Sequence, residues 1–596
     1  MPGRAEQPDI PPALREQMRD HLAFLYSRDR LESIWARLVQ ILAGFRGPRR
    51  PRAALDEGDT VLITYGDQFR ERGPAGERAE PPLRTLHRIL TGPLSQGSRP
   101  VVSGVHLLPF FPYSSDDGFS IIDYTRVNPD MGAWHDVEGL GQDFRLMFDL
   151  VLNHVSRESE WFQRFLAGDP GYRDWFITVD PDEPRDWVEK VVRPRARPLL
   201  TPVETAWGKT LVWTTFSEDQ IDLNYAHPPV LLRMIEILLL YVEKGAEIIR
   251  LDAIAYLWKE RGTSCLHLEE THRVVKLFRS VLDAVAPGTV IITETNVPHE
   301  ENISYFGDGS DEAHLVYNFS LPPLTMHSLL TGDAQVLSGW AAGLETPSDQ
   351  TTFFNFTASH DGIGVTPARG LLSADEIQAL VDATEQRGGF VSYKAEADGS
   401  RSVYELNISY VDAVSDPALG NGPAQVARFM VSQAIMLSLA GVPGIYVHSL
   451  IGSRSWRQGV EQTGRTRTIN REKLERGQLE QELADAASLR SQVLDGYHRL
   501  LGARRGEPAF HPQGAQQVLQ IEIAVFCLLR ISPDGHSHVL CAHNVSGQSR
   551  RLLLDPESLG LPAGTWRDLL SGSEYLVESD GLELALPPYG VQWLKV

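Results

Sequence analysis

Eight short apolar segments recur along the 596-residue chain, and each ends in polar or turn residues. Segments of this kind are typical of parallel strands that are buried on both faces. Helix-patterned stretches lie between several of them, as in residues 228–245 and 268–288. The segments cover residues 60–67, 104–112, 145–154, 246–256, 289–296, 315–322, 352–362 and 441–452. This alternation predicts a (β/α)8 barrel, whose functional residues gather at the carboxyl ends of the strands.

Departures from this spacing divide the chain into parts. Residues 1–57 have a helical pattern and precede the first strand, so they predict a helical extension. The barrel should occupy residues 58–505, with insertions at about 155–220 and about 365–425. Residues 506–596 alternate short apolar runs with turns, as a small antiparallel β-domain does. The expected fold class is therefore α/β: a TIM barrel with inserted small domains, a helical N-terminal extension and a C-terminal antiparallel β-domain.

Composition excludes several classes of function. The net charge of −22 argues against binding to nucleic acid or to an anionic membrane, because both would be repelled. The three cysteines are widely spaced and form no disulfide or metal-ligand pattern, which suits a reducing compartment. No apolar run is long enough for a signal peptide or a membrane span. We therefore expect a cytoplasmic protein without a metal or a cofactor; the sequence does not indicate an oligomeric state.

Carboxylates stand at the ends of three predicted strands: Asp252 at the fourth, Glu294 at the fifth and Asp361 at the seventh. Arg250 lies two residues before Asp252 and hence on the same face of that strand. A structural ion pair is the alternative interpretation of Arg250 and Asp252 taken alone. A structural ion pair does not explain why three acids stand at the strand ends, where the active sites of barrel enzymes lie. We therefore expect an active site there.

Four sequence blocks, "DLVLNH", "IRLDA", "ITE" and "SHDG", occur on these strands in this order. They resemble the four blocks of the α-amylase superfamily, whose members cleave or transfer α-glucosyl groups with retention. The resemblance covers about residues 60–596. It implies that Asp252 is the nucleophile, Glu294 the general acid and base, and Asp361 the carboxylate that binds sugar hydroxyls. We expect Arg250 to favour the ionised form of Asp252, and burial to raise the pKa of Glu294.

The local sequence resembles the sucrose phosphorylase branch more narrowly, for example in "GVHLLPFFPYSSDDGF", "RLDAIAYLWKERGTSC" and "INREK". Enzymes of that branch move glucose between an α-glucoside and inorganic phosphate through a covalent glucosyl-enzyme. The resemblance implies two apolar walls, Phe216 and Tyr256, although aromatic residues at such positions more often belong to a core. The implied polar contacts to glucose are Asp117, His154, Arg250, His360 and Arg471, with both histidines as neutral donors.

A phosphate acceptor requires cations near the site. The segment "VVRPRARP" places Arg193, Arg195 and Arg197 in the loop expected over the barrel mouth. A solvated basic loop is the alternative interpretation of such a run. By resemblance, Arg195 and Tyr404 are the expected phosphate contacts.

The expected acceptor site departs from sucrose phosphorylases. Thr295 and Asn296 stand where those enzymes usually carry Val and His, and Glu405 replaces a Gln beside Tyr404. Over its whole length the chain most resembles the glucosylglycerate phosphorylases, which convert 2-O-α-glucosylglycerate and phosphate to α-glucose 1-phosphate and glycerate. Arg454 and Arg457 are the candidates to bind the glycerate carboxylate.

Other activities stay open on the sequence alone. Glu405 suits acceptor hydroxyls better than a carboxylate, which leaves glucosylglycerol phosphorylase as the nearest alternative. Sucrose phosphorylase, sucrose 6-phosphate phosphorylase and a retaining α-glucosidase would use the same three carboxylates. An inactive amylase-like binding subunit would predict a membrane anchor and eroded carboxylates, and the sequence has neither.

Overall fold

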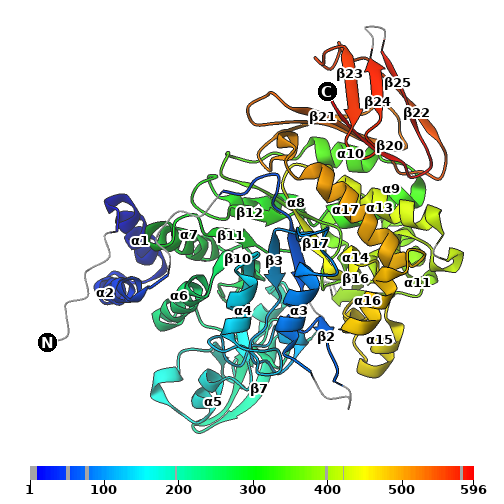
Figure 1. Ribbon diagram of the computed structural model, residues 1–596. Helices are drawn as coiled ribbons and strands as arrows, with labels where there is room; N and C mark the ends of the chain where they lie inside the picture. Colours follow the sequence, from blue (N-terminus) through cyan, green and yellow to red (C-terminus); the bar gives the residue numbers. More distant parts are fainter. Residues whose placement is uncertain are drawn as a thin grey trace.

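A closed barrel of eight parallel strands forms the centre of the computed structural model, which describes residues 10–47, 54–73, 79–194, 197–395, 401–420, 422–577 and 581–596 (Figure 1). Around the barrel the order is β1-β17-β13-β12-β11-β10-β4-β3. The strands are β1 (Val61–Thr64), β3 (Gly104–Leu107), β4 (Arg145–Val151), β10 (Ala246–Asp252), β11 (Val290–Thr293), β12 (Leu315–Tyr317), β13 (Thr352–Phe356) and β17 (Val442–Tyr446). Each of the eight apolar segments contains one of them, and the predicted fold class is confirmed.

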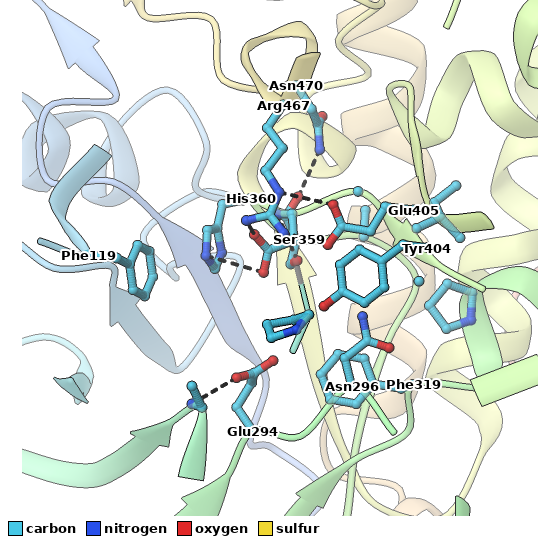
Figure 2. Close-up of a pocket in the computed structure, with 18 of the residues that line it drawn as sticks. Phe119, Glu294, Asn296, Phe319, Ser359, His360, Tyr404, Glu405, Arg467 and Asn470 are labelled. Carbon is cyan, nitrogen blue, oxygen red and sulfur yellow. Dashed lines mark hydrogen bonds and ion pairs between the residues drawn. The ribbon is translucent and has the colours of Figure 1, made fainter. Parts of the chain in front are cut away.

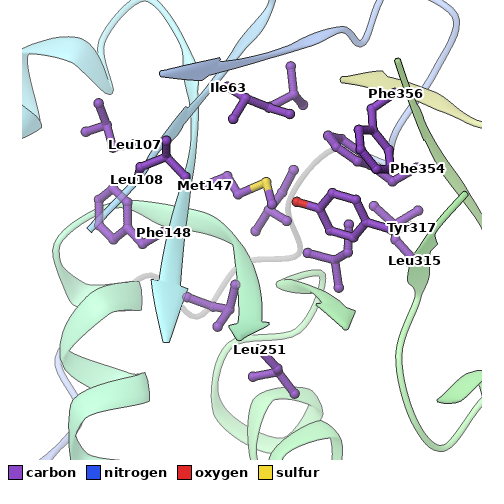
Figure 3. Close-up of a cluster of buried hydrophobic side chains, with 14 of the residues drawn as sticks. Ile63, Leu107, Leu108, Met147, Phe148, Leu251, Leu315, Tyr317, Phe354 and Phe356 are labelled. Carbon is purple, nitrogen blue, oxygen red and sulfur yellow. The ribbon is translucent and has the colours of Figure 1, made fainter. Parts of the chain in front are cut away.

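Burial on both faces explains why these strands are almost wholly apolar. Every residue of six of the eight strands, among them β1, β3 and β13, is buried. Figure 3 shows part of this core, where Met147, Leu251 and Phe354 come from three different strands. Three buried charged residues interrupt it: Asp149 of β4, and Arg250 and Asp252 of β10. Arg250 lies in register with Asp149. These charges therefore have to satisfy one another inside the barrel.

Helices cover the outside of the barrel. The main ones are α3 (Pro82–Thr91), α4 (Trp134–Leu140), α6 (Pro228–Glu243), α7 (Glu269–Val285), α9 (Leu321–Thr331), α13 (Pro423–Ser438) and α17 (Leu489–Arg504). The N-terminal helices α1 (Pro12–Leu25) and α2 (Arg28–Gly44) pack against α7 and α6 (Figure 1). No helix in the described ranges is long and apolar enough to cross a bilayer.

Two excursions from the barrel carry small sheets. After β4, β5 (His154–Ser156) pairs with β9 (Gln220–Asp222), and β6 (Thr178–Val179), β8 (Gly208–Trp213) and β7 (Leu200–Thr205) form a sheet. After β13, β14 (Ile363–Gly364), β16 (Arg401–Asn407) and β15 (Phe390–Ala395) form another, and α11 (Ala374–Gln386) lies between β14 and β15 in the chain. Both excursions leave from carboxyl ends of barrel strands, so they extend the face where the acids were predicted.

The C-terminal strands form an antiparallel sheet in the order β19-β20-β21-β26-β23-β24, beside the pair β22-β25. Their bounds are β19 (Ala515–Leu519), β20 (Val525–Ile531), β21 (His538–Asn544), β22 (Arg550–Leu554), β23 (Gly564–Asp568), β24 (Glu574–Val577), β25 (Leu582–Leu586) and β26 (Val591–Lys595). A separate apolar cluster around Trp566 and Leu584 fills the space between them. The domain boundaries drawn after residues 57 and 505 stay predictions.

Buried Arg504, the last residue of α17, joins the strands that close the barrel. Its guanidinium donates to the carbonyl oxygens of Asp59 and Gly441, at 3.2 and 3.3 Å, and these residues precede β1 and β17. It also donates to the carbonyl oxygen of Phe510, at 3.2 Å, on the way to the C-terminal domain. Burial, together with the nearby Arg530, lowers the pKa of Arg504 to about 9. One side chain thus satisfies backbone groups from three parts of the chain.

Replacing Arg504 by Ala should reduce the free energy of unfolding by about 3 kcal/mol, because several buried carbonyl oxygens lose their donor. Chemical denaturation followed by intrinsic fluorescence measures this. Arg499→Ala, at an exposed position of the same helix, is the matched control and should change stability by less than about 0.5 kcal/mol. Equal midpoints for the two variants would contradict the assigned role.

Candidate active site

A cavity of about 920 Å³, part of it open to solvent, lies at the carboxyl ends of the barrel strands. Asp252, Glu294 and Asp361 all line it. Figure 2 shows Glu294 among other residues of this cavity. The first excursion contributes His154, Phe216 and Gln220, and the second contributes Tyr404 and Glu405. The site is therefore built where both excursions meet the barrel.

Arg250 is the centre of a buried acidic cluster. Its Nη1 lies 2.6 Å from Asp252 Oδ1 and also contacts Asp149, and its Nη2 lies 3.7 Å from Glu294 Oε2. Asp149 in turn lies 2.7 Å from Nε2 of His106 on β3. None of the three acids has a side chain more than 15% exposed. Because one guanidinium faces three buried carboxylates, the cluster favours keeping a proton.

Burial raises the pKa values of both Asp252 and Glu294. Glu294 adds to the effect on Asp252, and Asp361 adds to the effect on Glu294, while Arg250 acts against both shifts. The expectation that Arg250 would decide the state of Asp252 was incomplete, since burial outweighs it. Two such acids share one proton as a pair. The closer contact of Arg250 with Asp252 favours the charge on Asp252 and the proton on Glu294.

The backbone fixes the position of Glu294. Ala253, directly after the end of β10, has a positive φ of 50°, a conformation that non-glycine residues seldom adopt. In this conformation its N–H donates to Oε2 of Glu294 at 3.0 Å. The strained backbone at Ala253 thus goes together with a hydrogen bond from its N–H to the Glu294 carboxylate.

Asp361 has a different electrostatic environment. Its Oδ1 lies 2.6 Å from Nη1 of Arg467 and 3.5 Å from Nη2 of Arg471. Burial acts to raise the pKa of Asp361, but the two arginines more than offset this and hold it below the usual range. Asp361 is therefore ionised, which suits the role of hydrogen-bond acceptor expected from the sequence.

The two histidines are neutral. Burial lowers the pKa of His360 to about 3, and it also lowers the pKa of His154. His360 stacks on Phe119, with ring centroids 4.9 Å apart and planes within 5° of parallel. His154 Nε2 lies 2.9 Å from the carbonyl oxygen of Phe119. Phe119 thus holds both rings at one wall of the cavity.

The rim near Asp361 carries the predicted pair Asp117 and Arg471, which contact one another. Asp116 and Asp117 both have positive φ, at 54° and 51°, so their turn is strained. Asp219 stabilises this loop from the first excursion, because its Oδ2 accepts hydrogen bonds from Ser114 at 2.6 Å and from Ser120 at 2.8 Å.

The predicted aromatic walls differ in placement. Phe216 lines the cavity, and its ring centroid lies 5.2 Å from that of His154. Tyr256 packs edge-on against Phe216 at 5.5 Å. Among the described residues, Tyr256 therefore supports the wall and does not line it.

Only some of the residues predicted to contact the acceptor line the cavity. Asn296, Tyr404 and Glu405 line the cavity, and Asn296 lies so close to Gly364 of β14 that a Cβ there would come within 2.7 Å of its Nδ2. Arg454 instead donates to Asp412 at 2.6 Å and to the carbonyl oxygen of Gly420 at 3.0 Å. Arg457 is exposed at the start of α15 (Arg457–Thr463) and gives no inner cation either. The predicted contact Arg195 lies outside the described residues.

Two cations of the site were missed from the sequence. Arg467 lies four residues before Arg471 in "RTRTINREK", which was its only signal. Lys259 is buried, with its Nζ 2.8 Å from Asp222 Oδ2 and 2.5 Å from Asn153 Oδ1. It joins the loop after β10 to β9 and thereby holds the first excursion against the barrel. Within the described ranges, no three His, Cys, Asp or Glu side chains are grouped to hold a metal ion.

Comparison with known proteins gives consistent matches. Residues 101–352 match the family model described as the catalytic domain of alpha amylase. The glucosylglycerate phosphorylase of Spirochaeta thermophila is 51% identical over 97% of this chain and 98% of its own, and that of Allomeiothermus silvanus 51% over 90% and 94%. The crystal structure of sucrose 6F-phosphate phosphorylase from Thermoanaerobacter thermosaccharolyticum has a TM-score of 0.70 at 24% identity, covering 90% of this chain and 99% of that one.

The opposite pKa shifts of Asp252 and Asp361 predict opposite effects on stability. Because the pKa values of Asp252 and Glu294 are both raised, ionisation of this pair destabilises the fold as pH rises above about 4, the value in an unfolded chain. Asp252→Asn should therefore gain melting temperature relative to the wild type between pH 5 and 8. A lowered pKa makes Asp361 stabilising above about pH 4, and this contribution is lost as pH falls through its folded pKa.

Asp361→Asn is the matched variant and should lose melting temperature at neutral pH, with the loss shrinking in acid. Thermal unfolding by calorimetry across this pH range measures both variants. Shifts of the same sign in the two variants at neutral pH would contradict the electrostatic assignment.

Proposed function

We propose glucosyl transfer to inorganic phosphate for this chain, which belongs to the α-amylase superfamily and, within it, to the glucosylglycerate phosphorylases. It is a retaining glycoside phosphorylase that converts 2-O-α-D-glucosylglycerate and phosphate reversibly to α-D-glucose 1-phosphate and D-glycerate. The observation that carries this proposal is the match over nearly the full length to relatives of that name. The cavity supplies the groups that such a reaction needs.

In the first displacement, we assign Asp252 as the nucleophile that attacks the anomeric carbon of the bound glucosyl group. Glu294 gives its proton to the glycosidic oxygen, so that glycerate leaves as a neutral alcohol at that position. The product is a glucosyl ester of Asp252. Arg250 supports this role because its closer contact favours the charge on Asp252. Ionised Asp361 accepts hydrogen bonds from sugar hydroxyls, which strengthen as positive charge develops on the ring.

In the second displacement, a phosphate oxygen attacks the same carbon from the face that glycerate left. Glu294, now a carboxylate, accepts the phosphate proton where one is present, and Asp252 departs. Two inversions give net retention, so the product is α-glucose 1-phosphate. Carboxylates suffice for both steps, and we propose no cofactor or metal.

Cations at the mouth of the cavity support phosphate as the acceptor. Arg197, Arg465, Arg467 and Arg471 line its outer part, together with five acidic residues. Guanidinium groups can bind an anionic acceptor through charge-assisted hydrogen bonds. Arg195 and Tyr404 stay the predicted phosphate contacts, and Tyr404 lines the cavity. Hydrolysis would not require these cations.

We infer that the enzyme works in the cytoplasm on small molecules and not on nucleic acid. The three cysteines, all within described ranges, are free and buried, which suits a reducing compartment. The charged product, glucose 1-phosphate, would not cross a membrane by itself.

The test is to incubate the protein with 2-O-α-glucosylglycerate, with and without phosphate, and to measure glucose 1-phosphate and free glucose. Glucose 1-phosphate should form only with phosphate and should far exceed glucose. Asp252→Ala should lower both products by about 10⁴-fold or more, since the nucleophile is lost. Free glucose at a rate independent of phosphate would identify a hydrolase, and phosphorolysis of glucosylglycerol in preference would favour the nearest alternative.

A further inference from the structure

We propose that Arg467 binds the anionic group of both acceptors, the carboxylate of glycerate and inorganic phosphate, and so determines acceptor specificity. This inference rests on the proposed function. Arg467 is the only Lys or Arg among the described residues that line the inner cavity with the two reacting acids. An anion that enters so far requires a cation there, because burial of an unpaired charge is costly.

Arg467 stands at the border between the glucose and acceptor parts of the cavity. On one side its Nη1 lies 2.6 Å from Asp361, which we assign to sugar hydroxyls. On the other, its Nε and Nη2 donate to the two oxygens of Glu405, at 3.0 and 2.5 Å. Glu405 follows Tyr404, and Figure 2 shows both side chains facing the same space as Glu294 and Asn296.

Glu405 holds Arg467 in place and does not repel the acceptor. Its side chain is only 3% exposed, so its charge requires the fork that Arg467 provides. A guanidinium has five N–H donors, and the hydrogen bonds of Arg467 within the described ranges, both to Glu405, use two of them. Its Nη1 forms an ion pair with Asp361. At least one N–H on each Nη nitrogen is left to bind a ligand. This removes the difficulty that an acid beside the acceptor posed for a carboxylate substrate.

The chemistry of the two acceptors places their charges alike. In glucosylglycerate, the carboxylate is attached to the same carbon that bears the glycosidic oxygen. In phosphate, the other charged oxygens are attached to the phosphorus atom that bears the attacking oxygen. In both, the negative charge lies close to the atom that carries the reacting oxygen: one bond beyond phosphorus in phosphate, and two bonds beyond the carbon in glycerate. A single cation near the reacting centre therefore serves the leaving glycerate and the incoming phosphate, whereas glycerol offers it only a hydroxyl.

The competing interpretation is that Arg467 only neutralises Asp361 and Glu405. That role would affect every acceptor equally, so the measured quantity is a ratio. With α-glucose 1-phosphate as the donor, kcat/KM is measured for D-glycerate and for glycerol, and any effect on the donor step cancels. Arg467→Gln should lower the glycerate-to-glycerol ratio by about 10- to 100-fold. Arg467→Lys keeps the charge but loses the bidentate geometry of the guanidinium, so its glycerate-to-glycerol ratio should lie between those of R467Q and the wild type.

Further variants keep the test decisive. If R467Q fails to fold because Glu405 is left unpaired, the double variant E405Q/R467Q removes both charges and should show the same fall. Glu405→Gln alone should lower the ratio by a smaller factor, because Arg467 loses part of the fork that holds it in place. Arg454→Gln, which removes the ion pair with Asp412, should leave the ratio unchanged.

The outcomes separate this inference from the proposed function. If the wild-type protein does not use glycerate or phosphate at all, the proposed function fails. If it does use them, a ratio within twofold of wild type in the folded Arg467 variants would overturn the role of Arg467. A fall in R454Q with no fall in R467Q would also overturn it and would assign the carboxylate to Arg454.

Discussion

The buried guanidinium of Arg250 is the interaction on which the rest of the structure depends. It lies in register with Asp149 inside the barrel, and it also contacts Asp252 and approaches Glu294 at the carboxyl end. Such a charge is tolerated in a protein interior only when it is fully paired. Arg250 therefore links β4 to β10 through its ion pair with Asp149. It also lies beside Asp252 and Glu294, the two acids that share one proton. An excess of carboxylates over cations costs stability, as functional sites commonly do.

The parts outside the barrel serve to complete this cluster. The first excursion carries Asp219, which holds the strained turn at Asp116 and Asp117, and the buried ammonium of Lys259 holds that excursion in place. The second excursion carries Glu405, which holds Arg467 over the acceptor space. Each excursion thus supplies one charged contact that positions a residue of the cavity. Under the proposed function, donor and acceptor recognition are separated onto two segments of the chain.

The barrel and its acids could be predicted from the sequence because their signals are local. A mostly apolar segment such as 246–252 indicates a buried strand. An acid at the end of such a strand is expected at the carboxyl-end face of the barrel. The Arg467–Glu405 pair could not be predicted, since it forms only when β16 packs beside the loop after β17. Arg454 was preferred for the same reason: its partner Asp412 is 42 residues away. The raised pKa of Asp252 depends on burial from all sides, which neighbours in sequence do not reveal.

The proposed reaction passes through a covalent glucosyl group on Asp252, which phosphate then removes. Glu294→Gln lacks the acid but should still react with α-glucosyl fluoride, whose leaving group departs without a proton. Mass spectrometry of the digested protein should then find one glucosyl group on the peptide that contains Asp252. Added phosphate should release it as glucose 1-phosphate faster than water releases glucose. A glucosyl group on another residue, or a release that phosphate does not accelerate, would contradict the account.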